Sequence, residues 1–346
     1  MRDSKGLRWI CDRGKEILKL AAGLLAISFL LYGINESGKF LYESARDNIL
    51  LACAELEDSE GTIETVLLGT SLMHVGMDGQ TLGEELDSTC FNLATSSQPV
   101  SGSYYLLEDV IKDNPVERVF FGIGVNTFVS SSENRDTSAK VRVMKMIQSY
   151  SGKLRFLMTS AEPKEWESLI FCTARTDDLL DLETIKQNVD YKLSDDFKDR
   201  IQHENARYDY YGMGSESTSK VFNGKIKGNK IPSNNIWSRD KIVEENVDDI
   251  RKMAALCEEK GIEFSIVVFP HAECFAEKQG DLADMDLFLE ELCEEIGAGL
   301  YDYNMTARPD IYDTLQVEMF MDKKHLNHAG AVQFAKLLAK DYKNAQ

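Results

Sequence analysis

Thr62-Ile-Glu-Thr-Val-Leu-Leu-Gly-Thr-Ser71 is the stretch of sequence that decides the fold. Its apolar and β-branched residues form a short run that ends in glycine, which is typical of a buried strand in a parallel sheet. A serine just past a strand tip has an exposed hydroxyl and a free backbone N–H, so Ser71 is a candidate nucleophile. The alternative is that Gly69-Thr-Ser71 is an ordinary turn, because serine and glycine are common turn residues.

Further strand-like runs follow along the chain, and helical patterns separate them. The predicted strands are 90–94, 118–125, 263–269 and 299–303, and the predicted helices are 101–113, 238–260, 283–296 and 328–343. Strands that alternate with helices predict an α/β fold, here a flavodoxin-like three-layer sandwich with a parallel sheet of about five strands. Ligands of such sheets bind at the carboxyl ends of the strands.

Residues 130–236 interrupt this alternation and are predicted to be a helical insertion. Helical patterns cover 137–149, 163–174 and 178–188, and a polar stretch follows from Gly212 to Asn235. Three tyrosines lie just before that stretch, at positions 208, 210 and 211. The insertion is expected to cover or shape the site, and its tyrosines form either a substrate-binding lid or a small core of their own.

The N-terminal region predicts a membrane anchor. A basic segment (1–16) precedes an apolar stretch (17–34) of about the minimum length that spans a bilayer, and a juxtamembrane helix (35–60) follows. The positive-inside rule leaves the N-terminus in the cytoplasm and the rest of the chain extracytoplasmic, on a single-pass cell-membrane protein. A cleaved signal peptide and a buried core helix are the alternatives, but the former lacks small residues at a cleavage site.

Charge and cysteine content argue against two classes of function. Residues 1–19 carry six basic and three acidic side chains, so the remainder has a net charge of −22 against −19 for the whole chain. This strong negative charge repels nucleic-acid phosphates, so no nucleic-acid partner is expected. The seven cysteines show no CxxC spacing, so no zinc site is indicated.

A second chemically suggestive stretch, Asp322-Lys-Lys-His-Leu-Asn-His-Ala-Gly330, precedes the last helix. On a turn, Asp322 can accept the Nδ1 proton of His325 and leave Nε2 free as a base toward a serine. Asn126 follows the third strand, and its amide is a candidate donor to an oxyanion together with the Ser71 N–H. The alternatives are that Asp322 caps a turn, that His325 is a surface side chain, and that Asn126 only ends a strand.

Two other histidines are possible substrate-binding residues. His74 lies three residues after Ser71, on the same face of a helix that starts there. His271 follows the strand 263–269 and so lies at a carboxyl edge. A metal site built from Asp322, His325 and His328 would lack ligands from elsewhere in the chain, so no metal is expected.

These motifs together resemble the SGNH/GDSL hydrolase superfamily from about Thr62 to the C-terminus. The resemblance rests on a serine in the first block, Asn92-Leu-Ala94 in the second, Gly124-Val-Asn126 in the third and Asp322-x-x-His325 near the C-terminus. The layout is similar to that of membrane-anchored members that act on cell-envelope polymers, such as alginate O-acetylation and DltD-like teichoic-acid D-alanylation proteins. The sequence departs from the superfamily pattern at Ala94, where glycine is usual, and at Thr127, where many members carry aspartate.

The resemblance implies that residues 61–346 form an SGNH-like catalytic domain without a cofactor. It assigns Ser71 as nucleophile, His325 as base and Asp322 as its orienting partner, and the oxyanion hole to Ser71, Ala94 and Asn126. The expected function is that of an extracytoplasmic serine esterase or O-acyltransferase that acts through an acyl-enzyme on a cell-envelope or secreted glycan. A membrane-bound acyl-delivering protein is an expected partner.

Two alternatives to this function remain open. One is a non-catalytic polymer-binding or assembly protein with the same fold. The other is a metal-dependent phosphoesterase that uses the loop of Asp322 and His325.

Overall fold

A computed structural model describes residues 3–130, 137–225 and 231–346. The side chains of residues 3–14, 21, 24, 25 and 28 lie outside this description, as do residues 131–136 and 226–230 of the predicted insertion. The basic side chains before position 15, which belong to the predicted segment 1–16, therefore also lie outside the described part of the structure.

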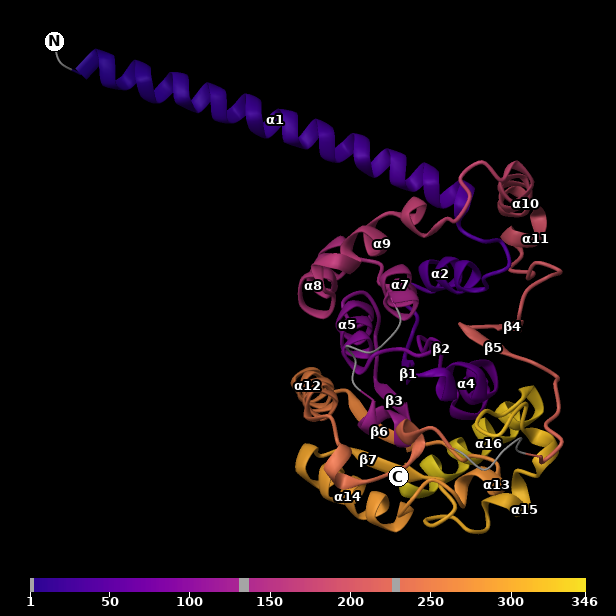
Figure 1. The fold of residues 1–346 in the computed structure, drawn as a ribbon. Coiled ribbons are helices and arrows are strands. Elements are labelled where there is room, and N and C mark those ends of the chain that lie inside the picture. Colours follow the sequence, from indigo (N-terminus) through magenta and orange to yellow (C-terminus); the bar gives the residue numbers. More distant parts are fainter. Residues whose placement is uncertain (1–2, 131–136, 226–230) are drawn as a thin grey trace.

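The centre of the molecule is a parallel sheet of five strands, which confirms the predicted α/β fold (Figure 1). The strand order is β2-β1-β3-β6-β7, and every neighbouring pair is parallel. The strands are β1 (Thr65–Gly69), β2 (Cys90–Asn92), β3 (Arg118–Ile123), β6 (Glu263–Val268) and β7 (Gly299–Asp302). Each overlaps one of the predicted strands. The order of the chain along the sheet reverses at β1 and β3, so their carboxyl ends form the crevice where ligands of such sheets bind.

Helices cover both faces of the sheet because successive strand residues point to opposite sides. On one face, Leu68 and Phe121 pack with α2 (Ile49–Asp58), α5 (Val100–Val110), α12 (Glu244–Lys260) and α14 (Leu282–Ile296). On the other face, Leu67 and Phe120 pack with α3 (Ser71–Gly76), α4 (Gly79–Leu86), α15 (Ile311–Thr314) and α16 (His328–Ala345). The two short helices α6 (Val125–Val129) and α13 (Glu273–Ala276) follow β3 and β6.

Two glycines let α3 start directly over the strand tips. Gly69 and Gly122 are register partners at the carboxyl ends of β1 and β3. A Cβ on Gly69 would lie 2.4 Å from the Gly122 carbonyl oxygen, and Gly69 has a φ of 141° that side chains disfavour. A Cβ on Gly122 would lie 2.8 Å from the Cβ of Met73 in α3. The first strand therefore ends in glycine because the backbones approach too closely for any side chain.

The insertion contributes helices and one hairpin. Its elements are α7 (Thr137–Met146), α8 (Tyr150–Ser160), α9 (Trp166–Ile170), α10 (Leu182–Leu193), α11 (Asp195–Lys198), β4 (Asp209–Gly212) and β5 (Ser215–Ser217). The predicted helix 163–174 is in fact broken, because 3-10 turns at Pro163–Glu165 and Cys172–Arg175 flank α9. The hairpin β4–β5 was not predicted. It packs on the body, where the Tyr210 hydroxyl bonds Glu55 and the Tyr211 ring stacks on His328.

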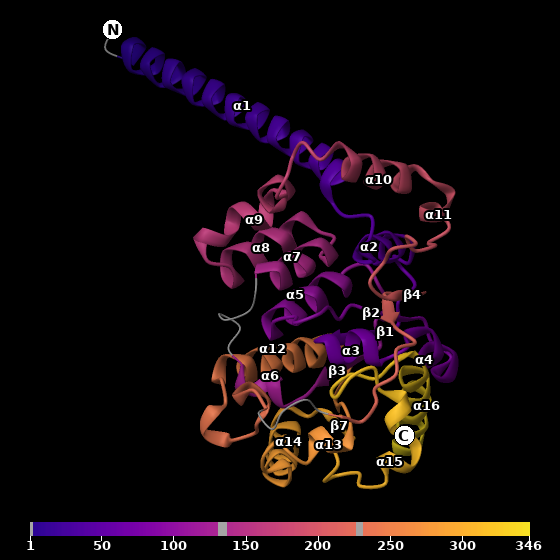
Figure 2. The same ribbon diagram turned by 45° about the vertical axis from the view of Figure 1, so that its right-hand side comes forward.

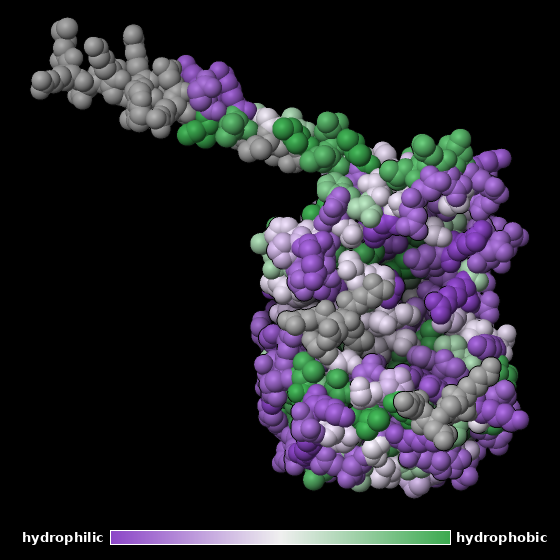
Figure 3. Space-filling view, viewed as in Figure 1, coloured by the Kyte–Doolittle hydropathy of each residue, from purple (hydrophilic) through white to green (hydrophobic). Residues whose placement is uncertain are grey.

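The N-terminal helix α1 (Asp3–Tyr42) leaves the body as one long rod (Figures 1 and 2). It runs through the predicted anchor without a break and ends within the predicted helix 35–60, because residues 43–48 separate it from α2. Between positions 17 and 34 its described large apolar side chains are exposed (Figure 3). Among the residues that the structure describes, no helix combines the length and the apolar character needed to cross a membrane.

The base of α1 is fixed to the insertion. The Lys192 ammonium in α10 donates to the carbonyl oxygens of Lys39, Phe40 and Glu43, at 2.9, 3.0 and 2.8 Å. These belong to the end of the helix and the residue after it, where helical carbonyls generally lack intrahelical partners, although the Lys39 carbonyl oxygen also accepts the Glu43 N–H at 3.1 Å. Burial lowers the pKa of Lys192 to about 8. The junction between α1 and the body is therefore a specific contact and not a flexible linker.

Candidate active site

Ser71 lies at the carboxyl edge of the sheet, as predicted. It is the first residue of α3 and follows Thr70, which has an extended backbone. The first residues of a helix have no intrahelical acceptor for their N–H groups, so the Ser71 N–H is available to a ligand. The sharp change from strand to helix at this point depends on the close contact of Gly69 with Gly122.

The Ser71 hydroxyl meets the imidazole of His325, although 254 positions separate them along the chain. Ser71 Oγ lies 2.8 Å from His325 Nε2, and His325 Nδ1 lies 3.0 Å from Asp322 Oδ2. A carboxylate only accepts hydrogen bonds, so Nδ1 carries the ring proton and donates it to Asp322. Nε2 then accepts from the serine hydroxyl, which is the arrangement that activates a serine as a nucleophile.

Asp322 holds this loop as well as the imidazole. Its Oδ1 also accepts the backbone N–H groups of Lys324 at 2.7 Å and His325 at 3.0 Å. Burial opposes ionisation, but the hydrogen bond and charge of His325 outweigh it and hold the pKa of Asp322 well below its ordinary value. The Asp-x-x-His spacing works because a single turn brings the carboxylate to both the backbone and the ring of His325.

The residues after His325 fix the loop to the last helix. Asn327 is the N-cap of α16, where its side chain accepts the Gly330 N–H at 3.1 Å. The Met321 N–H donates to the His325 carbonyl oxygen at 2.9 Å, which closes the loop. His328 starts α16 and stacks on Tyr211. Among the described residues, no group of three or more His, Cys, Asp or Glu side chains is placed to hold a metal ion.

The two predicted oxyanion donors besides Ser71 differ in their surroundings. Asn126 is half-buried in α6, and its Oδ1 lies 3.5 Å from the point that a Cβ on Gly124 would occupy. That same point lies 2.7 Å from Leu72 Cδ1, so Asn126 borders the residue after Ser71. The Ala94 N–H, in contrast, donates to Asn92 Oδ1 at 3.1 Å inside the protein. That amide is therefore engaged in the fold.

Thr127, which stands where the superfamily often has aspartate, has a structural role. Its hydroxyl accepts the Gly124 N–H at 3.2 Å, and its own N–H donates to the Gly124 carbonyl oxygen at 2.9 Å. These two bonds hold the first turn of α6, which carries Asn126. Thr127 thus stabilises the turn on which the position of Asn126 depends.

His271 lies at the same edge, just after β6. Its Nδ1 lies 2.9 Å from the Lys324 carbonyl oxygen, and its Nε2 lies 3.6 Å from the position of a Cβ on Gly124. Burial lowers the pKa of His271 to about 4, so the ring is neutral at pH 7. Nδ1 therefore donates to Lys324, and Nε2 presents a lone pair toward the region of Gly124 and Asn126.

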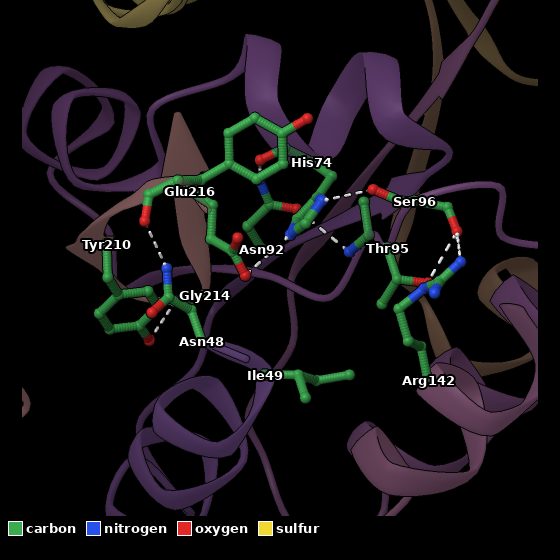
Figure 4. Close-up of polar contacts among 12 residues, drawn as sticks. Asn48, Ile49, His74, Asn92, Thr95, Ser96, Arg142, Tyr210, Gly214 and Glu216 are labelled. Carbon is green, nitrogen blue, oxygen red and sulfur yellow. Dashed lines mark hydrogen bonds and ion pairs between the residues drawn. The ribbon is translucent and has the colours of Figure 1, made fainter. Parts of the chain in front are cut away.

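His74 lies one turn along α3 from Ser71 and lines a cavity of about 140 Å³ (Figure 4). Its Nε2 is 3.4 Å from Glu216 Oε1, and its Nδ1 is 3.4 Å from Ser96 Oγ. Glu216 comes from β5 and was not predicted as a site residue. A signal for it exists in Gly212-Met-Gly214, because glycines between two short runs indicate a hairpin.

A scan against models of protein families finds no match, and a search of curated protein sequences finds no significant one.

Proposed function

We propose that this chain is a serine esterase or O-acyltransferase that acts through an acyl-enzyme on Ser71. The observation that carries the proposal is the continuous pair of contacts from Ser71 to His325 at 2.8 Å and from His325 to Asp322 at 3.0 Å. The resemblance of the surrounding motifs to the SGNH/GDSL superfamily supports the same chemistry.

The reaction begins when His325 Nε2 takes the hydroxyl proton of Ser71. The serine oxygen attacks the acyl carbon of an ester, and the tetrahedral intermediate collapses as His325 returns the proton to the leaving alcohol. Water or a sugar hydroxyl then gives its proton to His325 and attacks the acyl-enzyme. The second tetrahedral intermediate collapses as His325 gives that proton to Ser71 Oγ, which releases the acyl product and restores the free serine. Asp322 stays ionised throughout and stabilises the imidazolium that forms in each half-reaction.

The oxyanion of the intermediate is bound by the Ser71 N–H and the Asn126 side-chain amide. Asn126 is given this role because the Ala94 N–H already donates to Asn92. Removal of one such donor typically lowers the rate by about 10²- to 10³-fold. A rate loss of this size in Asn126→Ala would therefore support Asn126, and not Ala94, as the second donor.

We place the apolar part of α1 in a membrane. The exposed side chains at positions 17, 18, 20, 27, 29, 30, 31 and 34 lie on several sides of the helix, with no gap wider than about 100° between them when plotted at about 100° per residue. A helix that is apolar on every side requires an apolar medium all round, which one protein surface does not provide. The basic residues before it orient the body to the extracytoplasmic side, where a cell-envelope or secreted glycan is the substrate and a membrane-bound acyl-delivering protein is the partner.

The decisive experiment is mass spectrometry of the full chain after exposure to an activated acetyl ester. We expect an acetyl adduct on the peptide that contains Ser71, and loss of the adduct in His325→Ala. Because His328→Ala leaves the Ser71–His325 contact intact, it is the matched control and retains the adduct. An unmodified Ser71 in the folded wild-type protein would contradict the proposal and favour a non-catalytic polymer-binding protein.

A further inference from the structure

The loop that carries His325 belongs to no helix or strand, so regular secondary structure does not fix it. Two hydrogen bonds from the segment after β6 hold it against the sheet. His271 Nδ1 donates to the Lys324 carbonyl oxygen at 2.9 Å. The next residue, Ala272, donates its N–H to the Lys323 carbonyl oxygen at 3.2 Å. Because β6 and β1 belong to one sheet, these contacts tie the base to the framework that carries the nucleophile.

The peptide plane between Lys324 and His325 is held at both of its polar groups. Its carbonyl oxygen accepts from His271, and its N–H donates to Asp322 Oδ1 at 3.0 Å. A peptide unit is rigid and includes the Cα atoms on either side, so the two bonds restrain the Cα of His325 and the direction of its side chain. The Nε2 atom of that side chain lies 2.8 Å from Ser71 Oγ. The donation from His271 thus reaches the nucleophile through one peptide and one imidazole.

His271 is itself fixed by its neighbours. Its side chain is buried, the edge of its ring meets Phe275 with the ring centroids 5.4 Å apart, and its carbonyl oxygen accepts the Tyr312 hydroxyl at 2.9 Å. Burial lowers the pKa of the ring to about 4, so a neutral imidazole faces the loop at pH 7. A carbonyl oxygen only accepts hydrogen bonds, so the single ring proton is on Nδ1. The ring therefore offers one donor in one direction.

We propose that His271 is a positioning residue of the reaction, because its donation to the Lys324 carbonyl oxygen keeps His325 in hydrogen-bond contact with the nucleophile. The inference rests on the proposed acyl-enzyme mechanism, and it adds a residue that acts through the base and not on the substrate. Without the donation the peptide plane turns and the imidazole moves with it. A displacement of about 1 Å at reacting atoms lowers a rate about 10²-fold.

Two substitutions of equal size separate the hydrogen bond from the space that the ring fills. Asparagine and leucine side chains share their branching and their number of heavy atoms, but only asparagine has an N–H that can replace Nδ1. His271→Asn therefore keeps the donation to the Lys324 carbonyl oxygen, and His271→Leu loses it. Both variants leave the same space where the imidazole was, so an effect of packing is common to both.

The first readout is single-turnover acylation of the full chain in detergent by p-nitrophenyl acetate. We expect His271→Leu to lower the maximal acylation rate constant about 10²-fold, the factor for a displaced reacting group. Its KM is expected to stay at the wild-type value, because the proposed role involves no contact with the substrate. His271→Asn is expected to restore most of the rate.

Asn188→Leu is the matched control for lost stability. Asn188 is another buried side chain that donates to a backbone carbonyl, that of Leu41 at 3.0 Å, and its Oδ1 accepts the Ala45 N–H at 2.9 Å. These contacts lie at the base of α1 and not at the site. Urea unfolding is expected to show a loss of stability in Asn188→Leu as in His271→Leu, whereas only His271→Leu loses the acylation rate.

The second readout does not depend on activity. The Nδ1 proton of His325 lies in the hydrogen bond to Asp322, and a proton held in such a bond gives an NMR signal far downfield of the backbone amides. We expect this signal in the wild type and in His271→Asn, and its broadening or loss in His271→Leu. Its absence from His325→Ala identifies it. A wild-type protein without the signal would contradict the fixed contact on which the proposal depends.

Equal acylation rates in His271→Leu and His271→Asn would overturn the proposal, as would a downfield signal that is the same in both. A raised KM with an unchanged rate constant in both variants would also overturn it, because the ring would then bind the substrate. Failure of the proposed function is a separate result, in which wild-type Ser71 forms no acyl-enzyme. The NMR comparison of the two variants then still decides whether His271 positions His325.

Discussion

The Asp322→Asn substitution tests the role of the carboxylate with little change in shape. The Asp322 Oδ1 atom accepts both backbone N–H groups of its turn, so an asparagine oxygen at that position keeps the loop closed. The new amide nitrogen then faces His325 Nδ1, where two donors would meet. The imidazole avoids this by moving its proton to Nε2, which can no longer accept the hydroxyl proton of Ser71.

The expected loss is about 10⁴-fold in kcat, the effect of the wrong tautomer in a serine triad, which corresponds to about 5.5 kcal/mol in activation free energy. The free energy of unfolding changes far less, because the turn retains its two backbone bonds. We would measure hydrolysis of p-nitrophenyl acetate under single-turnover conditions, with urea unfolding in parallel.

Asp281→Asn is the matched control, since Asp281 accepts the Asp284 N–H as the N-cap of α14 but contacts no histidine. It is expected to retain full activity. An Asp322→Asn protein within tenfold of wild type would refute the reasoning, because the tautomer would then not depend on Asp322.

Further predictions concern pH, packing and the helix junction. His271 binds a proton below about pH 6.5 in the unfolded chain but only below about pH 4 in the folded one. As the pH is lowered from about 6.5 to about 4, the free energy of unfolding is therefore expected to fall by roughly 3 kcal/mol. His271→Asn is expected to lose this dependence, which urea unfolding at a series of pH values measures. Gly69→Ala is expected to destabilise the protein by about 2 kcal/mol more than Gly61→Ala. Both glycines have a positive φ, but only Gly69 lacks space for a Cβ. Equal losses in the free energy of unfolding would contradict this reasoning. Lys192→Met removes three charge-assisted bonds and is expected to speed proteolysis after α1 at least about tenfold, the factor for the loss of one such bond. Lys186→Met, from an exposed position of the same helix α10, leaves the rate unchanged.

The sheet was predictable from sequence because buried parallel strands are short, continuous and apolar. The run that ends at Gly69 has this form, and so does the one that ends at Ile123. The strand β5, Ser215–Ser217, has three polar residues and no apolar alternation, so only the glycines at 212 and 214 before it indicate a hairpin. The division between α1 and α2 was missed for a similar reason, because residues 43–48 contain neither proline nor glycine.

The Ser71, Asp322 and His325 contacts followed from two local motifs and the rule that strand tips meet at one edge of the sheet. The cavity beside His74 did not follow from that rule, since it depends on how the insertion folds back. Glu216 comes from a segment without a periodic pattern, so its contact with His74 could not be predicted. Sequence patterns locate groups on regular elements, whereas contacts between irregular segments require coordinates.

The Lys192 junction has a consequence for how the protein meets its substrate. If α1 lies in a membrane as proposed, a rigid junction holds Ser71 at a fixed height and orientation above the lipid. A flexible linker would instead allow the body many orientations. The effective concentration of acceptor groups is then set by which layer of the surrounding polymer occupies that height. A flexible spacer inserted after Tyr42 would widen the zone of modified polymer and dilute the reaction within it.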